Sequence, residues 1–491
     1  MSDHGPFSYP PDETGDLLAM SLLGDTIAAI ATPIGEGGIG VIRISGRNAL
    51  AVAGEMFRPI SGVPVPGLPT HTAHYGFAHD PITDEQIDDG VITVFRAPRS
   101  YTGEDSVEIS CHGGIVPMRR VLEAALRAGA RLAEPGEFTK RAFLSGRLDL
   151  AQAEAVLDVI RARTDEAMRV ANLQFSGVLS TRIRLLREEL IGIMAHIEAC
   201  IDFPEDVVEA DPKRIAESIR DTIRHVTEIL ETADRGKIFR EGIQAVIAGR
   251  PNVGKSSLLN ALLRECRAIV TPIPGTTRDV IEESINIRGI PVRTIDTAGV
   301  RKTEDEIERM GVERARQSIA QADLVLVVLD AQEGFTKEDR ALLSDLAGKK
   351  LIVVLNKADI LREADAEKLA RKVSVWVERN LPPGVVVRKT AAPSNEGIVE
   401  LEDAIAETVL CGAPTQIPAD GVVVSNVRHR RALEESRAAL EHALRTAEVE
   451  MPADLICIDL KSAADALGSI TGETVTDDVI DRIFSEFCIG K

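Results

Sequence analysis

Two short motifs constrain the fold of this 491-residue chain more than any other feature. Residues 249–256 read Gly-Arg-Pro-Asn-Val-Gly-Lys-Ser and follow an apolar run over 243–247 that is typical of a strand. Such a loop wraps a polyphosphate with its backbone amides, its lysine reaches the β- and γ-phosphates, and its final hydroxyl suits Mg2+. Residues 356–359, Asn-Lys-Ala-Asp, follow a second apolar run. Because the Asp359 carboxylate can accept hydrogen bonds from N1 and N2 of guanine, and adenine lacks that donor pair, the motifs predict a guanine-nucleotide site.

Two segments between these motifs are typical of γ-phosphate sensors. Residues 275–279 read Gly-Thr-Thr-Arg-Asp, and residues 296–299 read Asp-Thr-Ala-Gly. Val300 follows, where a Ras-like enzyme has the glutamine that orients the attacking water, and an aliphatic side chain cannot do this. Asn252 and the oxygens of residues 271–277 could instead form a cage for a monovalent cation such as K+, in the place that an arginine finger takes elsewhere. The alternative is that Asn252 is an ordinary solvated amide.

The last nucleotide contact is expected at the turn 390–393, Thr-Ala-Ala-Pro, where a Ser-Ala-x turn usually contacts guanine O6. A shift of this contact by one residue stays open, and a backbone amide is expected to serve in either case. The residues predicted to contact GTP are Asn252, Val253, Gly254, Lys255, Ser256, Ser257, Thr271, Thr276, Thr277, Asp296, Thr297, Ala298, Gly299, Asn356, Lys357, Asp359, Ala391 and Ala392.

Composition limits the remaining functions. The formal net charge of -20 argues against broad nonspecific binding of nucleic acid, so any RNA contact is expected to be local or shared with a partner. None of the six cysteines forms a Cys-x-x-Cys pair, and no run approaches the roughly 18 apolar residues of a membrane span, so we expect a cytoplasmic protein. Residues 1–24 lack the basic region of a targeting signal and are expected to be a disordered extension, with translation starting at Met1 or Met20.

The chain changes character along its length. Residues 25–145 contain short β-like runs with helical stretches between them and predict an α+β domain, whereas 146–240 and 411–491 are helical. Residues 241–410 hold the nucleotide motifs, so we expect a G domain inserted into one helical domain. The helical segment has an apolar stripe that we interpret as bundle core and not as a cofactor site. The stripe consists of Leu186, Leu190, Ile193 and Ile197.

Residues 35–40, Gly-Glu-Gly-Gly-Ile-Gly, also match the dinucleotide-binding pattern. That pattern requires a helix to follow, because the helix N-terminus meets the pyrophosphate. Residues 41–46 instead alternate β-branched and polar side chains as a strand does. We therefore predict a hairpin turn here.

Several further segments resemble the MnmE family of tRNA modification GTPases, also called TrmE, and the likeness covers residues 25–491. The resemblance implies a multidomain α/β protein: an N-terminal α+β tetrahydrofolate-binding domain that dimerises, a helical domain, and a Ras-like P-loop G domain inserted in it. It further implies that a homodimer acts with the flavoprotein MnmG on tRNA, adding a carboxymethylaminomethyl-type group at C5 of the wobble uridine with a folate one-carbon unit. The segments are 25–33 (Asp-Thr-Ile-Ala-Ala-Ile-Ala-Thr-Pro), 101–105 (Tyr-Thr-Gly-Glu-Asp), 135–143 (Pro-Gly-Glu-Phe-Thr-Lys-Arg-Ala-Phe), 148–155 (Leu-Asp-Leu-Ala-Gln-Ala-Glu-Ala) and 487–491 (Phe-Cys-Ile-Gly-Lys).

The resemblance also assigns roles to single residues. Glu308 matches the acid that orients water, which would fill the gap left by Val300, and it acts with Lys255 and Asn252 as the implied catalytic set. From the sequence alone Glu308 would be one more charge on an exposed acidic helix. The implied Mg2+ ligands are Ser256 and Thr277; the K+ ligands are Asn252, Thr271, Ile273 and Thr276; the contacts to 5-formyl-tetrahydrofolate or a related reduced folate are Arg43, Glu108, Arg147 and Lys491.

Three questions stay open at this point. Cys488 could be a nucleophile, although we favour a role in lining the folate pocket. A GTP-dependent RNA or ribosome assembly factor would share every nucleotide motif, but it predicts a basic RNA-binding module that this acidic chain lacks. A scaffold whose GTPase cycle only gates a partner enzyme is equally compatible with the motifs. The four folate contacts are far apart in sequence and can meet only if the C-terminal tail folds back onto the N-terminal domain, either of the same chain or of its partner in the dimer.

Overall fold

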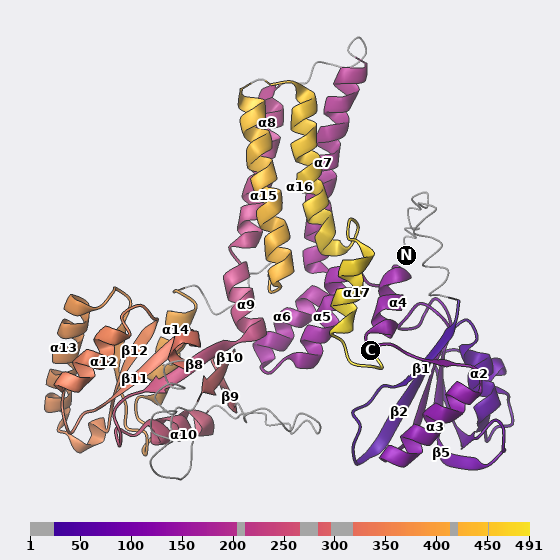
Figure 1. Ribbon diagram of the computed structural model, residues 1–491, viewed down its shortest axis with the longest axis horizontal. Helices are drawn as coiled ribbons and strands as arrows, with labels where there is room; N and C mark the ends of the chain where they lie inside the picture. Colours follow the sequence, from indigo (N-terminus) through magenta and orange to yellow (C-terminus); the bar gives the residue numbers. More distant parts are fainter. Residues whose placement is uncertain (1–23, 204–211, 266–282, 296–317, 413–420, 450) are drawn as a thin grey trace. The chain divides into compact units, whose positions relative to one another are not determined.

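The computed structural model describes residues 24–203, 212–265, 283–295, 318–412, 421–449 and 451–491 (Figure 1). The chain divides into two compact units, one formed by Met1–Leu157 with Thr471–Lys491 and the other by Asp158–Ile470. The sequence assigned all of 411–491 to the helical domain. Residues from Thr471 onward belong here to the first unit. The bounds of the five predicted segments remain a prediction.

The first unit is built on a seven-stranded sheet in the order β3-β4-β5-β6-β2-β1-β7. All neighbouring strands are antiparallel except β1 and β7, which are parallel. Helices α2 and α3 bury apolar faces in the same core as the sheet, so the predicted α+β fold is confirmed. The elements are β1 (Thr26–Ile30), β2 (Gly37–Gly46), α2 (Ala49–Met56), β3 (Phe57–Pro59), the 3-10 turn η1 (Val65–Gly67), β4 (Thr72–His79), β5 (Gln86–Phe95), β6 (Ser106–Gly113), α3 (Ile115–Arg127) and β7 (Arg131–Leu132).

The glycine-rich segment 35–40 lies in a hairpin. Strands β1 and β2 pair in antiparallel register from Thr26 opposite Gly46 to Ile30 opposite Ile42. The segment therefore covers the end of the connection and the first residues of β2, where no helix begins. The predicted hairpin is confirmed.

The C-terminal tail completes the first unit. Helices α4 (Glu137–Leu144), α5 (Leu150–Arg161) and α17 (Asp477–Ser485) share an apolar cluster that includes Leu150, Phe484 and Phe487. Gly136, just before α4, has a φ of 70°, and a Cβ there would lie 2.4 Å from the carbonyl oxygen of Phe484. This close backbone approach requires glycine and holds the tail against the start of α4.

The second unit contains a helical bundle and a nucleotide-binding type of sheet. In the bundle, α7, α8, α15 and α16 run side by side (Figure 1). Leu186, Leu190 and Ile197 are fully buried on α7 and Ile193 is half-buried, so the predicted stripe is bundle core. The helices are α6 (Asp165–Phe175), α7 (Val178–Asp202), α8 (Pro212–Leu230), α9 (Ala233–Glu241), α15 (Val427–Glu448) and α16 (Ala453–Thr471).

The second sheet has six strands in the order β13-β12-β11-β8-β10-β9, and only β9 is antiparallel to its neighbour. Alternate residues of β11 enter two different apolar cores, so both faces of the sheet are covered, as a parallel sheet requires. The elements are β8 (Ile243–Ala248), α10 (Lys255–Glu265), β9 (Glu283–Ile287), β10 (Ile290–Ile295), β11 (Leu324–Asp330), α12 (Lys337–Asp345), β12 (Leu351–Asn356), the 3-10 turn η2 (Ala358–Ile360), α13 (Glu363–Asn380), β13 (Val386–Lys389) and α14 (Ile398–Val409). Within the described ranges, no helix has the length and apolar character needed to cross a membrane.

Candidate functional sites

The predicted phosphate loop joins the end of β8 to the start of α10. Gly254 has a φ of 95°, and a Cβ there would lie 2.2 Å from the side-chain nitrogen of Asn356. Gly249 meets the backbone of the neighbouring strand in the same way, 2.4 Å from the carbonyl oxygen of Val328. The Lys255 ammonium donates to the carbonyl oxygens of Gly249 and Arg250, at 2.9 and 2.8 Å. The loop thus has the close backbone approaches and the internally held lysine of a polyphosphate cradle.

Asn356 ties the predicted nucleotide loops together. Its side chain is buried, and Nδ2 donates to the carbonyl oxygen of Val253 at 3.0 Å in the phosphate loop. Its Oδ1 accepts from the amide of Ala392 and the hydroxyl of Thr390, both at 3.3 Å. The base motif, the phosphate loop and the turn at 390–393 are therefore fixed to one buried amide group.

The predicted guanine contacts lie at the same end of the sheet. Asp359 is exposed just after β12. Its carboxylate is therefore accessible to a guanine base that binds from solvent. The amide of Ala391 donates to the carbonyl oxygen of Glu396 at 2.9 Å, and that of Ala392 to Asn356. Both predicted amides thus belong to one ordered turn, and their contact with O6 stays a prediction.

The predicted metal ligands are described only in part. Asn252 is exposed with a φ of 64°, and Ser256 is exposed in the first turn of α10. Amide and hydroxyl oxygens are hard donors that fit K+ and Mg2+. The remaining predicted ligands, phosphate sensors and catalytic acid lie outside the described residues: Thr271, Ile273, Thr276, Thr277, Asp296, Thr297, Ala298, Gly299 and Glu308.

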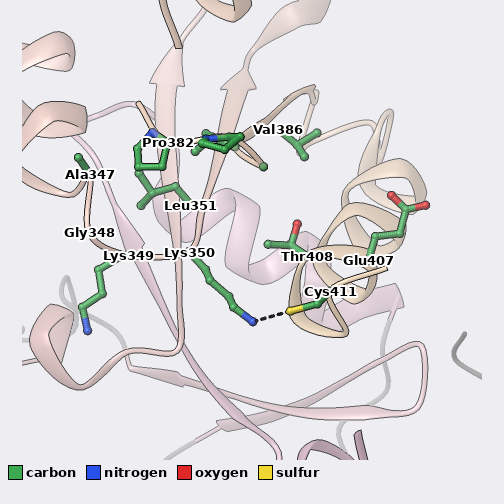
Figure 2. Close-up of a pocket in the computed structure, with 13 residues that line it drawn as sticks. Ala347, Gly348, Lys349, Lys350, Leu351, Pro382, Val386, Glu407, Thr408 and Cys411 are labelled. Carbon is green, nitrogen blue, oxygen red and sulfur yellow. Dashed lines mark hydrogen bonds between the residues drawn. The ribbon is translucent and has the colours of Figure 1, made fainter. Parts of the chain in front are cut away.

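A cavity of about 630 Å3 in the same domain takes no part in this site. Leu351 and Val386 line it at the amino ends of β12 and β13 (Figure 2). The predicted nucleotide loops follow the carboxyl ends of the strands. The Lys350 ammonium lies 3.3 Å from the sulfur of Cys411 at its edge. This cavity is therefore separate from the predicted nucleotide site.

The first unit brings the predicted folate residues together. Arg43 on β2 and Glu108 on β6 are directly opposite in the antiparallel register. The guanidinium contacts Oε1 of Glu108 through Nε at 2.9 Å and Nη2 at 2.8 Å. Its Nη1 donates to the carbonyl oxygen of Gly490 at 3.3 Å. The pair on the sheet therefore also holds the C-terminal tail.

Arg147 joins this group through Tyr101. Its Nη1 donates to the carbonyl oxygen of Tyr101 at 2.7 Å, and its guanidinium carbon lies 5.4 Å from the centre of the tyrosine ring. The guanidinium of Arg43 lies 5.2 Å from the same ring and 5.6 Å from that of Phe138. Two predicted cations thus share one aromatic ring, at distances typical of cation–π contact.

Lys491 is the fourth member. Burial lowers the pKa of its ammonium, Arg43 lowers it further, and Glu108 offsets this only in part. The tail is held in place by Gly490, where φ is 95° and a Cβ would lie 2.2 Å from the carbonyl oxygen of Ile30. The tail folds back within one chain, so the four predicted residues meet. Cys488 is exposed in this tail, and its two alternative roles remain open.

A buried charge network beside this group was not predicted. Arg141 is 1% exposed, and its guanidinium pairs with Glu137 at 2.9 Å, Glu104 at 3.3 Å and Asp25 at 2.5 Å. Burial raises the pKa of the Glu104 carboxyl although Arg141 opposes this shift. Glu104 also accepts from the hydroxyl of Ser45 at 3.1 Å. The network fixes the loop 101–105 that carries Tyr101. Both Tyr101 and Arg141 lie in segments that resemble the family, but the sequence assigned neither of them a role in a site.

Comparison with known proteins agrees with this arrangement. The family model described as MnmE helical domain matches residues 150–488, and the model described as GTP-binding protein TrmE N-terminus matches residues 26–147. The tRNA modification GTPase MnmE of Geobacillus kaustophilus (strain HTA426) is 50% identical over 470 residues, which cover 95% of this chain and 99% of that protein. The protein of the same name from Bacillus subtilis (strain 168) is 47% identical over 469 residues, 95% of this chain and all of the relative.

Among solved structures, the G domain of the T. maritima FeoB iron transporter is 26% identical and covers 34% of this chain and 98% of that chain, with a TM-score of 0.24. The identities to the MnmE proteins extend over both units, which sets aside the alternative of a ribosome assembly factor. This chain therefore belongs to the MnmE family of tRNA modification GTPases.

Proposed function

We propose that this GTPase works as a cytoplasmic homodimer with the flavoprotein MnmG, and that it helps to add a carboxymethylaminomethyl-type group at C5 of the tRNA wobble uridine. In this proposal a reduced folate bound in the first unit supplies one carbon. GTP hydrolysis in the second unit depends on K+ and on dimerisation.

The observation that carries the folate proposal is the meeting of Arg43, Glu108, Arg147 and Lys491 in one unit. A folate presents a pterin edge, which a carboxylate can pair with, and carboxylates, which arginine or lysine can hold. Both contacts from Arg43 use Oε1 of Glu108, whose side chain is 31% exposed, and no described residue donates to Oε2. That oxygen can accept from pterin N–H groups, while Arg147 and Lys491 provide positive charge for the carboxylates.

The phosphate loop supports the proposal for hydrolysis. Mg2+ at Ser256 and Thr277 would neutralise charge on the β- and γ-phosphates, and K+ at Asn252 and the 271–276 oxygens would supply charge where other enzymes use an arginine finger. Lys255 binds the β- and γ-oxygens. The Glu308 carboxylate accepts a hydrogen bond from the attacking water and orients it for in-line attack on the γ-phosphate.

Contacts within the second unit support a link between GTP hydrolysis and helix α6. The hydroxyl of Thr164 donates to the carbonyl oxygen of Gly289 in the β9–β10 turn at 2.8 Å and accepts from the amide of Ala167 at 3.1 Å as the cap of α6. Gly289 has a φ of 85°, and a Cβ there would lie 2.7 Å from Cγ of Glu166. Strand β10 leads directly to the γ-phosphate sensor at 296–299. A conformational change at the predicted sensor can therefore be transmitted through β10 and the Gly289 turn to the first turn of α6.

Calorimetry with 5-formyl-tetrahydrofolate tests the proposal. The full chain, a variant lacking residues 488–491 and the Glu108→Gln variant are titrated in parallel, and GTP affinity is measured on each as a control for folding. We expect both variants to lose at least about ten-fold in folate affinity, since each loses a charged contact, while GTP affinity is retained. Wild-type folate affinity in both variants would overturn the assignment of this site.

A further inference from the structure

Asp330 lies where three strand ends meet. It is the last residue of β11, which lies between β8 and β12 in the sheet and is parallel to both. The phosphate loop follows β8 and the base motif follows β12. Asp330 is 3% exposed, and its position in β11 is directly opposite Asn356. A buried carboxylate is thus placed between the two halves of the nucleotide site.

This carboxylate holds the lysine of the base motif. The ammonium of Lys357 donates to Oδ2 of Asp330 at 2.6 Å and to the carbonyl oxygen of Asn252 in the phosphate loop at 2.9 Å. Burial by itself raises the pKa of Asp330, but the hydrogen bond and charge of Lys357, together with the backbone amides of Gln332 and Glu333, outweigh it and hold the pKa below its ordinary value. The Asp330 carboxylate thus holds the Lys357 ammonium in place, and the second contact of that ammonium fixes the phosphate loop.

Two residues at this contact, Asn252 and Lys357 itself, have strained backbone conformations. Asn252 has a φ of 64° and Lys357 a φ of 60°, in the left-handed region that side chains other than glycine rarely adopt. Such conformations persist only where surrounding contacts enforce them. The hydrogen bond from Lys357 to Asn252 is one such contact, and its direction depends on the carboxylate of Asp330.

We propose that Asp330 is a positioning residue for guanine nucleotide binding. It acts through Lys357: it aims the ammonium at the carbonyl oxygen of Asn252 and so keeps the base motif and the phosphate loop at one separation. It also neutralises the charge of the half-buried Lys357 ammonium beside the phosphate loop. Without this carboxylate the base motif and the phosphate loop are no longer held at a fixed separation. Their contacts with the base and the phosphates both weaken, so bound GDP dissociates faster.

A second role of Asp330 has to be separated from this one. Its Oδ1 accepts from the amide of Gln332 at 2.9 Å and its carbonyl oxygen accepts from the amide of Gly334 at 3.1 Å, which shapes the turn after β11. Asp330→Asn keeps an oxygen for the Gln332 amide but removes the charge that holds Lys357. Asp330→Ala removes both. Asp323→Asn is the matched control, because Asp323 accepts a backbone amide at 2.9 Å at the other end of the same strand.

The test is the dissociation rate of fluorescent mant-GDP from the full chain, with thermal unfolding as a check on folding. We expect dissociation about ten-fold faster in Asp330→Asn and unchanged in Asp323→Asn, as for the loss of a hydrogen bond to a charged group. Lys357→Met should be at least as fast as Asp330→Asn, and the double variant no faster than Lys357→Met alone. A wild-type rate in Asp330→Asn with a fast rate in Asp330→Ala would reduce Asp330 to its turn role. Rate increases that multiply in the double variant would show that it does not act through Lys357.

Discussion

Replacing Gly490 by alanine should release the C-terminal tail from the proposed folate site. A left-handed φ costs a residue with a Cβ about 1–2 kcal/mol, and the added atom would lie 2.2 Å from the carbonyl oxygen of Ile30. That oxygen belongs to the backbone of β1 and cannot move aside as a flexible side chain can. Displacing the tail also breaks the contact from Arg43 to the Gly490 carbonyl, and a hydrogen bond to a charged group contributes about 1.5–3 kcal/mol.

The matched control is Gly129→Ala. Gly129 is in the same unit with a φ of 108°, and a Cβ there meets no atom within 4 Å. Both variants carry the backbone cost, but only Gly490→Ala adds the clash and the lost contact. We expect at least about a ten-fold loss of 5-formyl-tetrahydrofolate affinity for Gly490→Ala relative to Gly129→Ala by calorimetry, since 1.4 kcal/mol is a factor of ten, with equal GTP affinity. Equal folate affinity in the two variants would refute a role for the tail in this site.

Three further predictions concern the second unit. GTP turnover should be faster in K+ than in Na+ and should rise with protein concentration, and Asn252→Ala should remove the advantage of K+; equal rates of the wild type in both salts would contradict the cation cage. Glu308→Ala should keep near-normal GTP affinity but hydrolyse GTP about 10²-fold more slowly, and an unaltered rate would return Glu308 to the role of a solvated surface charge. Thr164→Val keeps the shape of the side chain but loses the hydrogen bond to Gly289. The difference in amide hydrogen exchange of α6 between the GDP and GTP-analogue states should therefore shrink, while GTP affinity stays the same. An undiminished difference would exclude the link between this turn and α6.

The sequence predicted the elements whose chemistry is local. The strands before the phosphate loop and the base motif, the hairpin at 35–40 and the apolar stripe on α7 each follow from spacing within one segment, and the structure has them. The need for the tail to fold back onto an N-terminal domain could also be predicted, because Lys491 cannot otherwise meet Arg43. The sequence left open whether that domain belongs to the same chain or to its dimer partner, and the structure has the contact within one chain. This prediction came from the proposed folate, which needs all four residues in one site, and not from a pattern in the sequence of the tail.

The contacts that the sequence did not predict join residues far apart in the chain. Arg141 lies in a short helix with charged neighbours and would be expected on the surface, yet carboxylates at positions 25, 104 and 137 enclose it. The pairing of Asp330 with Lys357 likewise depends on β11 and β12 being neighbours with Asp330 opposite Asn356. Strand order and register are set by the packing of the whole sheet, so such pairs become visible only in the fold.

The central claim, that this GTPase modifies the tRNA wobble uridine with a folate carbon, is tested most directly by mass spectrometry of tRNA nucleosides. Transfer RNA is prepared from cells that have this protein, from cells that lack it, and from the latter supplied with the wild-type chain, Gly490→Ala or Gly129→Ala. We expect the C5-substituted wobble uridine to disappear without the protein, to return with the wild-type chain and with Gly129→Ala, and to stay low with Gly490→Ala. The same content of that nucleoside with and without the protein would contradict the account.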